Sequence, residues 1–98
     1  MQIEKLKNGS TLTMKVSGRL DTLTAPELEK EVTESLNGVT DFVMDFSGLE
    51  YISSAGLRTL LFANKKMKGK GTYVILNVRD EVKDIFDVTG FADILTIK

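Results

Sequence analysis

The 98-residue sequence contains no cysteine, no histidine and no tryptophan, and it has a single proline. Without cysteine and histidine the chain lacks the usual ligands of zinc, haem and iron–sulfur clusters, so we expect no metal and no cofactor. The same absences exclude Ser-His and Cys-His nucleophile pairs and remove the side chain that most often transfers protons near neutral pH. We therefore expect a protein that is not an enzyme.

The sequence also lacks an excess of positive charge and any long apolar run. Its 13 Lys and Arg residues face 14 Asp and Glu residues, whereas domains that bind nucleic acid usually carry a basic face. No apolar run approaches the ~18 residues needed to cross a bilayer, and the first five residues do not resemble the apolar part of a signal peptide. We expect a cytoplasmic protein that neither binds nucleic acid directly nor inserts into a membrane.

The first elements follow from alternation and turn chemistry. Apolar and polar residues alternate strictly over Thr11–Ser17, which predicts a half-buried strand. Asn8-Gly9 just before it is a favoured hairpin turn, so Gln2–Leu6 should pair with it in antiparallel fashion. Gly18 is expected to end the second strand.

A helix and a buried strand should come next. Thr24 and Glu27 have the spacing of a capping box, which predicts a helix start. An apolar stripe at helical spacing follows and should face the core: Leu28, Val32 and Leu36. The nearly continuous apolar run Phe42–Phe46 predicts a central strand covered on both faces.

The remainder of the chain alternates in the same way. We expect the most buried helix from about Ser54 to Lys68, a strand over Tyr73–Leu76, a helix over Asp80–Val88, and a short strand or extended tail over Ile94–Ile97. The predicted order is β-β-α-β-α-β-α-β. It indicates an α/β fold in a single domain, residues 1–98, with a mixed sheet of about five strands and helices packed against it.

The most informative segment lies between the central strand and the buried helix. Ser53 and Ser54 stand at the helix start, and three interpretations remain open: N-capping, binding of an anion by free N–H groups, or phosphorylation of a serine hydroxyl. Gly56 is unusual inside a helix, where it costs roughly 0.5–1 kcal/mol relative to Ala. Either close packing or the approach of another molecule should require the missing side chain.

Two segments resemble the motifs of STAS domains, in particular those of small bacterial anti-sigma factor antagonists. The upstream segment is Gly18-Arg19-Leu20-Asp21-x-x-Thr24-Ala25, and the second is Asp45-x-Ser47-x-Leu49-x-Tyr51-Ile52-Ser53-Ser54-Ala55-Gly56-Leu57. The likeness extends over essentially the whole chain in length, element order and motif spacing. It implies a STAS-like fold with a mixed sheet.

The resemblance also implies a function. Members of this group bind an anti-sigma factor that is also a Ser/Thr kinase and so free the sigma factor for transcription. The kinase phosphorylates a serine at the start of the second helix, which weakens the complex, and a PP2C-type phosphatase restores the active form. On this chain the acceptor is Ser54. The family usually has Asp just before the acceptor, and Ser53 in that place is the second candidate.

The resemblance also places Asp21 at the family's partner-binding surface, although Asp21 could instead be a simple turn residue. We expect the partner to dock on the face around Asp21 and the two serines. The surface is expected to comprise Asp21, Thr24, Glu50, Ser53, Ser54, Ala55, Gly56 and Arg58. We expect a monomer or a weak dimer. Two other functions stay open: an unphosphorylated STAS scaffold subunit of a stress-sensing or lipid-transport complex, and a small enzyme or ligand binder that uses the helix start as an anion site.

Overall fold

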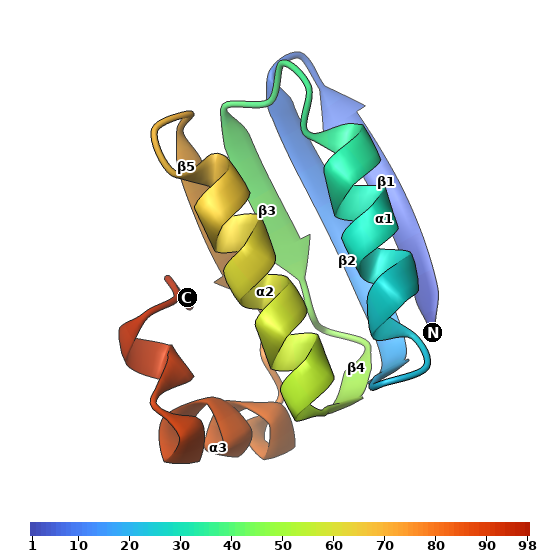
Figure 1. The fold of residues 1–98 in the computed structure, drawn as a ribbon, viewed down its shortest axis with the longest axis vertical. Helices are drawn as coiled ribbons and strands as arrows, with labels where there is room; N and C mark the ends of the chain where they lie inside the picture. Colours follow the sequence, from blue (N-terminus) through green and yellow to red (C-terminus); the bar gives the residue numbers. More distant parts are fainter.

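The computed structural model describes residues 1–98. Figure 1 shows its elements, which are β1 (Gln2–Asn8), β2 (Thr11–Leu20), α1 (Ala25–Ser35), β3 (Asp41–Asp45), β4 (Leu49–Ile52), α2 (Ser54–Met67), β5 (Thr72–Leu76), α3 (Asp80–Thr89) and a 3₁₀ turn, η1 (Phe91–Asp93).

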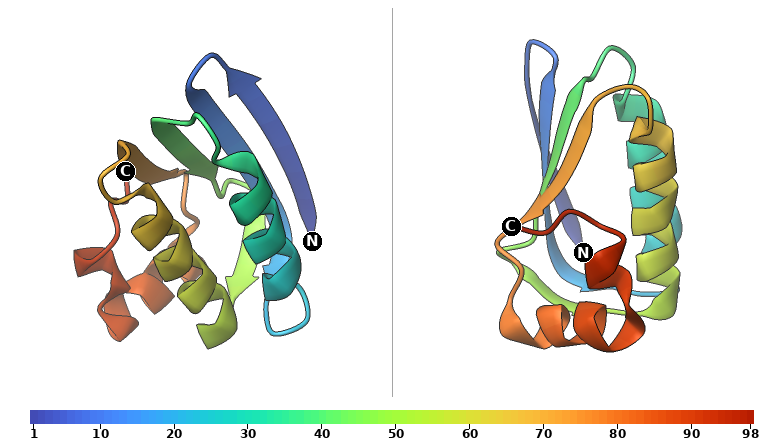
Figure 2. Two further views of the ribbon diagram at one scale, coloured as in Figure 1. Left: turned by 45° about the horizontal axis from the view of Figure 1, so that its top comes forward. Right: turned by 90° about the vertical axis from the view of Figure 1, so that its left-hand side faces the viewer.

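A mixed sheet forms one layer of the molecule. Its main path runs β1-β2-β3-β5, and β4 pairs with β2 beside that path. β1 and β2 form the antiparallel hairpin, whereas β3, β4 and β5 join in parallel. Helices α1 and α2 cover one face of the sheet and α3 closes one end, as the right-hand view of Figure 2 shows. The predicted α/β fold with a mixed sheet of about five strands is confirmed.

A single core lies between the sheet and the two long helices. The predicted stripe of α1 is buried at Leu28, Val32 and Leu36, and α2 contributes more buried residues than either other helix. The prediction that the Phe42–Phe46 run is covered on both faces is wrong. Phe42 and Met44 point into the core while Val43 is only half-buried, because all of the helical cover lies on one side of β3.

Strand β2 is longer than predicted and changes partner along its length. Its first half pairs with β3, and Gly18–Leu20 pair with β4, with a register shift between Gly18 and Arg19. Gly18 does not end the strand; it has φ +90°, which only glycine adopts easily, and so forms a bulge. The bulge turns the end of β2 toward β4, a strand that the sequence pattern did not predict.

The C-terminal segment is the extended tail and not a regular strand. Ile97 forms one isolated parallel bridge with Ile75 of β5, in which the Ile75 N–H donates to Thr96 O and the Lys98 N–H donates to Ile75 O, both at 2.9 Å. The tail thus lies along the outer edge of β5. None of the helices combines the length and the apolarity needed to cross a membrane.

Candidate functional site

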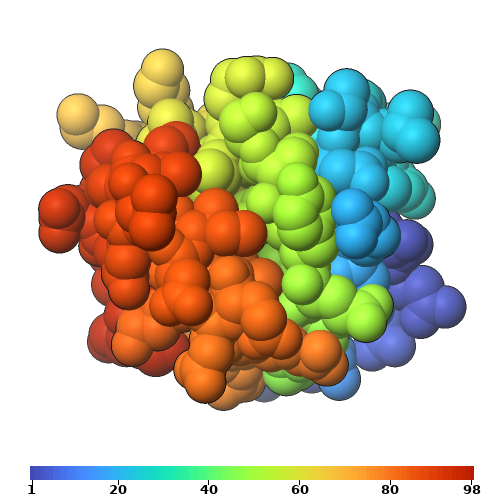
Figure 3. All heavy atoms as spheres, turned by 90° about the horizontal axis from the view of Figure 1, so that it is seen from below, coloured from blue at the N-terminus to red at the C-terminus, as the bar shows by residue number.

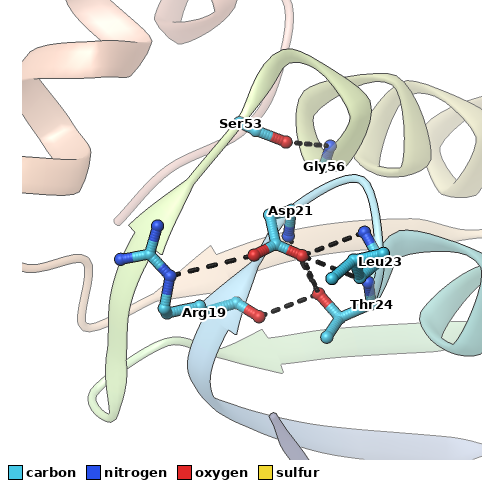
Figure 4. A network of polar contacts seen from close by, with 6 residues as sticks. All are labelled: Arg19, Asp21, Leu23, Thr24, Ser53 and Gly56. Carbon is cyan, nitrogen blue, oxygen red and sulfur yellow. Dashed lines mark hydrogen bonds and ion pairs between the residues drawn. The ribbon is translucent and has the colours of Figure 1, made fainter.

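The bulge in β2 and the short strand β4 bring the two sequence motifs together. The Gly18 N–H donates to Gly48 O and the Ser53 N–H donates to Leu20 O, each at 2.9 Å. Asp21 therefore follows directly after the residue that holds Ser53 in place. Figure 4 shows Asp21 and Ser53 facing the same region of the molecule from these two segments.

The two adjacent serines have different environments. Ser53 is the N-cap of α2: it is half-buried and its Oγ accepts a hydrogen bond from the Gly56 N–H at 3.4 Å. Ser54 is the first residue of the helix, its side chain is exposed, and its hydroxyl makes no hydrogen bond within the molecule. The capping role therefore belongs to Ser53, and Ser54 presents a free hydroxyl to solvent.

Gly56 is explained by close packing. A Cβ atom built on it would lie 2.7 Å from Cγ1 of Ile52 and 2.9 Å from the carbonyl oxygen of Leu20, closer than carbon atoms pack. Because Gly56 is buried, it does not itself lie on the predicted partner-binding surface. It lets α2 approach β2 and β4 closely enough to fix the position of the two serines.

Asp21 forms a tight turn between β2 and α1. Its Oδ1 accepts hydrogen bonds from the N–H groups of Leu23 at 3.0 Å and Thr24 at 3.2 Å, the pattern of an Asx turn. This confirms the turn interpretation. The residue also remains part of the surface, because its side chain is about a quarter exposed, at 27%.

The capping box predicted for Thr24 and Glu27 is wrong, although Thr24 does precede α1. The Thr24 side chain makes no cap hydrogen bond. Its hydroxyl instead donates to the carbonyl of Arg19 at 2.8 Å and accepts from the Asp21 N–H at 2.9 Å. Thr24 is half-buried, and its two hydrogen bonds stabilise the turn that Asp21 begins, as Figure 4 shows.

The charge of Asp21 is stabilised locally. Desolvation of the carboxylate would raise its pKa, but the backbone donors of Leu23 and Thr24, the Thr24 hydroxyl and the charge of Arg19 together hold the pKa below the ordinary value of 3.8. Arg19 lies between two partners. Its Nε is 3.8 Å from Oδ2 of Asp21, and its guanidinium carbon is 4.4 Å from the ring centroid of Tyr51.

The rest of the predicted surface flanks these groups. Glu50 is exposed on β4, and Arg58 is exposed one turn into α2, without an ion pair to any other residue. Ala55 is half-buried, and with Arg58 it lines a shallow hollow between α1 and α2. In Figure 3 the segments around residues 20–24 and 49–58 adjoin at this end of the molecule, beside α3.

Sequence reasoning missed three residues of this site. Leu23 is 88% exposed and Tyr51 is 37% exposed, although both are large and apolar, and Arg19 contacts Tyr51 across the β2–β4 pairing. The pairing was the missing information, because β4 was expected to be a loop. The one available signal in the sequence was an apolar residue, Leu23, in the short polar segment between Asp21 and the expected helix start.

The structure offers no cluster for a metal ion, since no three Asp or Glu side chains come together suitably. Asp45, the carboxylate that begins the second motif, lies at the end of β3 and is held there by hydrogen bonds. Its Oδ1 accepts from the Ser47 N–H at 2.9 Å and from the Asn77 side chain at 3.2 Å. Desolvation opposes its charge, but these donors lower its pKa below the usual value.

Comparison with known families fits this geometry. Residues 2–98 match the family model of the STAS domain. The chain belongs to the STAS domain family. The anti-sigma-B factor antagonist of Staphylococcus aureus is 30% identical to it over an alignment of 100 positions, which covers 99% of this chain and 92% of that protein.

Two solved structures share the STAS fold with this chain. A crystal structure of an anti-sigma factor antagonist from Mycobacterium paratuberculosis aligns with a TM-score of 0.86 and 20% identity, over 98% of this chain and 83% of that one. The Bacillus cell fate determinant SpoIIAA in its phosphorylated form aligns with a TM-score of 0.73 and 18% identity, over 99% and 89% of the two chains. At these identities the likeness concerns the fold.

Proposed function

We propose that this STAS domain is an anti-sigma factor antagonist, a cytoplasmic regulator of transcription without catalytic activity of its own. It binds an anti-sigma factor that is also a serine kinase, and so releases the sigma factor. The observation that carries the proposal is the free, exposed hydroxyl of Ser54 at the start of a helix that is firmly packed. The antagonist from Staphylococcus aureus, similar over almost the whole chain, supports it.

The docking region is the surface around Ser54, which we call the switch surface. It combines exposed apolar side chains with charges of both signs, a composition suited to a protein partner. Gly56 belongs to its support and not to its contacts. The switch surface comprises Asp21, Leu23, Thr24, Glu50, Tyr51, Ser53, Ser54, Ala55 and Arg58.

Ser54 is the group that the partner modifies. The kinase transfers the γ-phosphoryl group of ATP to the Ser54 Oγ, which loses its proton, and ADP leaves. A PP2C-type phosphatase hydrolyses the phosphate ester with water, which restores the hydroxyl and releases inorganic phosphate. Ser53 is the poorer acceptor because its hydroxyl caps α2.

The phosphate acts through charge. It adds about −1.5 to −2 charges at neutral pH to the end of the molecule where the segment of the Asp21 turn adjoins the segment that carries Glu50 and Ser54. The helix itself tolerates the charge, because negative groups are favourable in the first turn. A loss of only about 1.4 kcal/mol in the complex lowers affinity tenfold, so repulsion from the partner and lost contacts suffice to dissociate it.

Binding to the cognate anti-sigma factor tests the proposal. We expect Ser54→Asp to lower affinity by at least about tenfold, and Ser54→Ala to bind normally but to gain no phosphate during incubation with the kinase and ATP. Ser53→Ala is the matched control and should still gain one phosphate, seen by intact mass. Equal binding of Ser54→Asp and the wild type would contradict the charge switch. A stable complex without added phosphate would indicate the scaffold function instead.

The isolated domain should also behave as a monomer or a weak dimer. The switch surface must remain accessible to the partner, and a tight dimer through it would compete with docking. Sedimentation of the unphosphorylated protein, alone and with the anti-sigma factor, measures this directly.

A further inference from the structure

We infer that Arg58 binds the phosphate carried by Ser54, so that phosphorylation withdraws a positive charge from the switch surface as well as adding a negative one. The inference rests on Ser54 being the phosphorylated residue. Its basis is the position of Arg58 on α2 and the absence of any competing partner for its guanidinium group.

Arg58 and Ser54 are neighbours on one side of the helix. They are four residues apart in α2, so at 3.6 residues per turn their directions differ by only about 40°. Side chains on a helix also lean toward its N-terminus, and an arginine covers the turn before its own Cα. An arginine at position 58 can therefore reach the turn where Ser54 lies.

Two other cations of the molecule, Arg19 and Lys65, are less suited to bind a phosphate on Ser54. Arg19 is close to Asp21 and stacks on Tyr51. Lys65 lies about 16 Å from Ser54 along the axis of α2, at 1.5 Å per residue. Glu29 of α1 lines the same hollow as Arg58 without pairing with it. A phosphate is a stronger partner than this carboxylate, because it carries more negative charge and, like a carboxylate, can accept two parallel bonds from a guanidinium group.

The same geometry distinguishes the two serines. Ser53 precedes Arg58 by five residues, which places it about 140° away around the helix axis, and its hydroxyl is turned to the Gly56 N–H. A phosphate on Ser53 would therefore not meet Arg58. Recognition of the phosphate within the molecule should be specific to position 54.

The experiment uses the full chain with phosphoserine incorporated during translation at position 54, so that it does not depend on any kinase. Phosphorus NMR then follows the second ionisation of the phosphate. A nearby guanidinium stabilises the dianion and lowers its pKa, so we expect Arg58→Gln to raise this pKa by about 0.3–0.7 unit, the range of an exposed ion pair. Arg58→Lys should retain part of the effect.

Two controls separate pairing from a general effect of charge. Lys65→Gln removes the same charge from the same helix, beyond the ~8 Å screening length of physiological salt, and should leave the pKa unchanged. With phosphoserine at position 53 instead, Arg58→Gln should have no effect. The Arg58 Nε–H resonance should shift on phosphorylation at position 54 only.

The outcomes are decisive for Arg58 whether or not the proposed regulatory function holds. An unchanged phosphate pKa in Arg58→Gln, or an equal rise in Lys65→Gln, would overturn the inference. If instead the pKa responds as expected but the anti-sigma factor kinase adds no phosphate to Ser54, the pairing stands and the proposed function fails.

Discussion

The two ends of helix α2 differ in composition, and the end with less charge is the candidate site. Three exposed lysines gather at the C-terminal end: Lys65, Lys66 and Lys68. The N-terminal end begins with small neutral residues, yet it receives the bent end of β2, the strand β4 and the Asp21 turn. Charge density alone therefore does not mark a site; the convergence of chain segments does.

The lysines at the C-terminal end of α2 are mostly solvated, and one side-chain hydrogen bond joins them to the rest of the fold. Lys70, just beyond the helix, donates from its Nζ to the carbonyl of Leu36 at 2.7 Å. The other three lysines have no ion-pair partner, and positive charge is favourable at a helix C-terminus. We therefore expect substitutions at the two ends of α2 to change the stability of the fold by different amounts.

The largest difference in stability should come from the same change made at each end. Gly56→Ala places a methyl group against Leu20 and Ile52, and such overpacking should lower the free energy of unfolding by about 2 kcal/mol. Gly69→Ala meets nothing within 4 Å and only strains a backbone with φ +81°, for a loss of about 1 kcal/mol. Urea unfolding of both variants measures the difference. Equal losses would show that the N-terminal end is not tightly packed.

A smaller difference in stability is expected between the alanine variants of Ser53 and Ser54. Ser53→Ala removes the hydroxyl that accepts from the Gly56 N–H, and should cost about 0.5–1 kcal/mol, as loss of a helix cap does. Ser54→Ala removes a hydroxyl without a partner, and should leave stability unchanged or slightly raised because Ala favours helix. Thermal unfolding at neutral pH tests this pair. A reversed order would assign the cap to Ser54.

The smallest effect concerns pH. Because the pKa of Asp21 is lowered in the folded state, its carboxylate stabilises the fold at pH values above its unfolded pKa of ~3.9. That contribution is lost as the pH falls through the folded pKa. The free energy of unfolding should therefore fall less in Asp21→Asn than in the wild type when the pH is lowered from about 5 to about 3. Lys68→Gln at the other end of α2 is the control, and an unchanged pH profile in Asp21→Asn would refute the role of the carboxylate.

Much of the fold was predictable because its patterns are local. The alternation in Thr11–Ser17 and the helical stripe of α1 each identify an element and its buried face. The run Phe42–Phe46 was misread because Val43, on the open face, is apolar too. Apolar residues on an uncovered face conceal the alternation that would reveal it.

The errors cluster where β2 changes partner. Gly18 looks like a stop signal, but its positive φ allows the strand to bend and continue. Leu49–Ile52 is short and shows no alternation, since Glu50 and Tyr51 are both exposed. The pairing of these two segments draws Thr24 into the turn and away from a capping box. Such long-range pairing has no signature in either segment alone.

Ser54, by contrast, was identified as the phosphoacceptor through the family motif, and that assignment remains a prediction. The structure adds the reason why its neighbour is the poorer candidate, since the Ser53 hydroxyl is turned to the Gly56 N–H. It also adds three residues to the candidate site. Arg19 and Tyr51 come together through the β2–β4 pairing, and Leu23 is exposed in the turn after β2.

The C-terminal tail protects an outer strand of the sheet from pairing with another molecule. An outer strand with unpaired N–H and C=O groups invites a strand from another chain, the first step of fibre growth. In β5 the outward groups of Ile75 are already taken by Thr96 and Lys98. Thr96 and Lys98 thus cover the outer edge of β5 at Ile75, and removal of this tail would free the N–H and C=O groups of Ile75 to pair with a strand of another molecule.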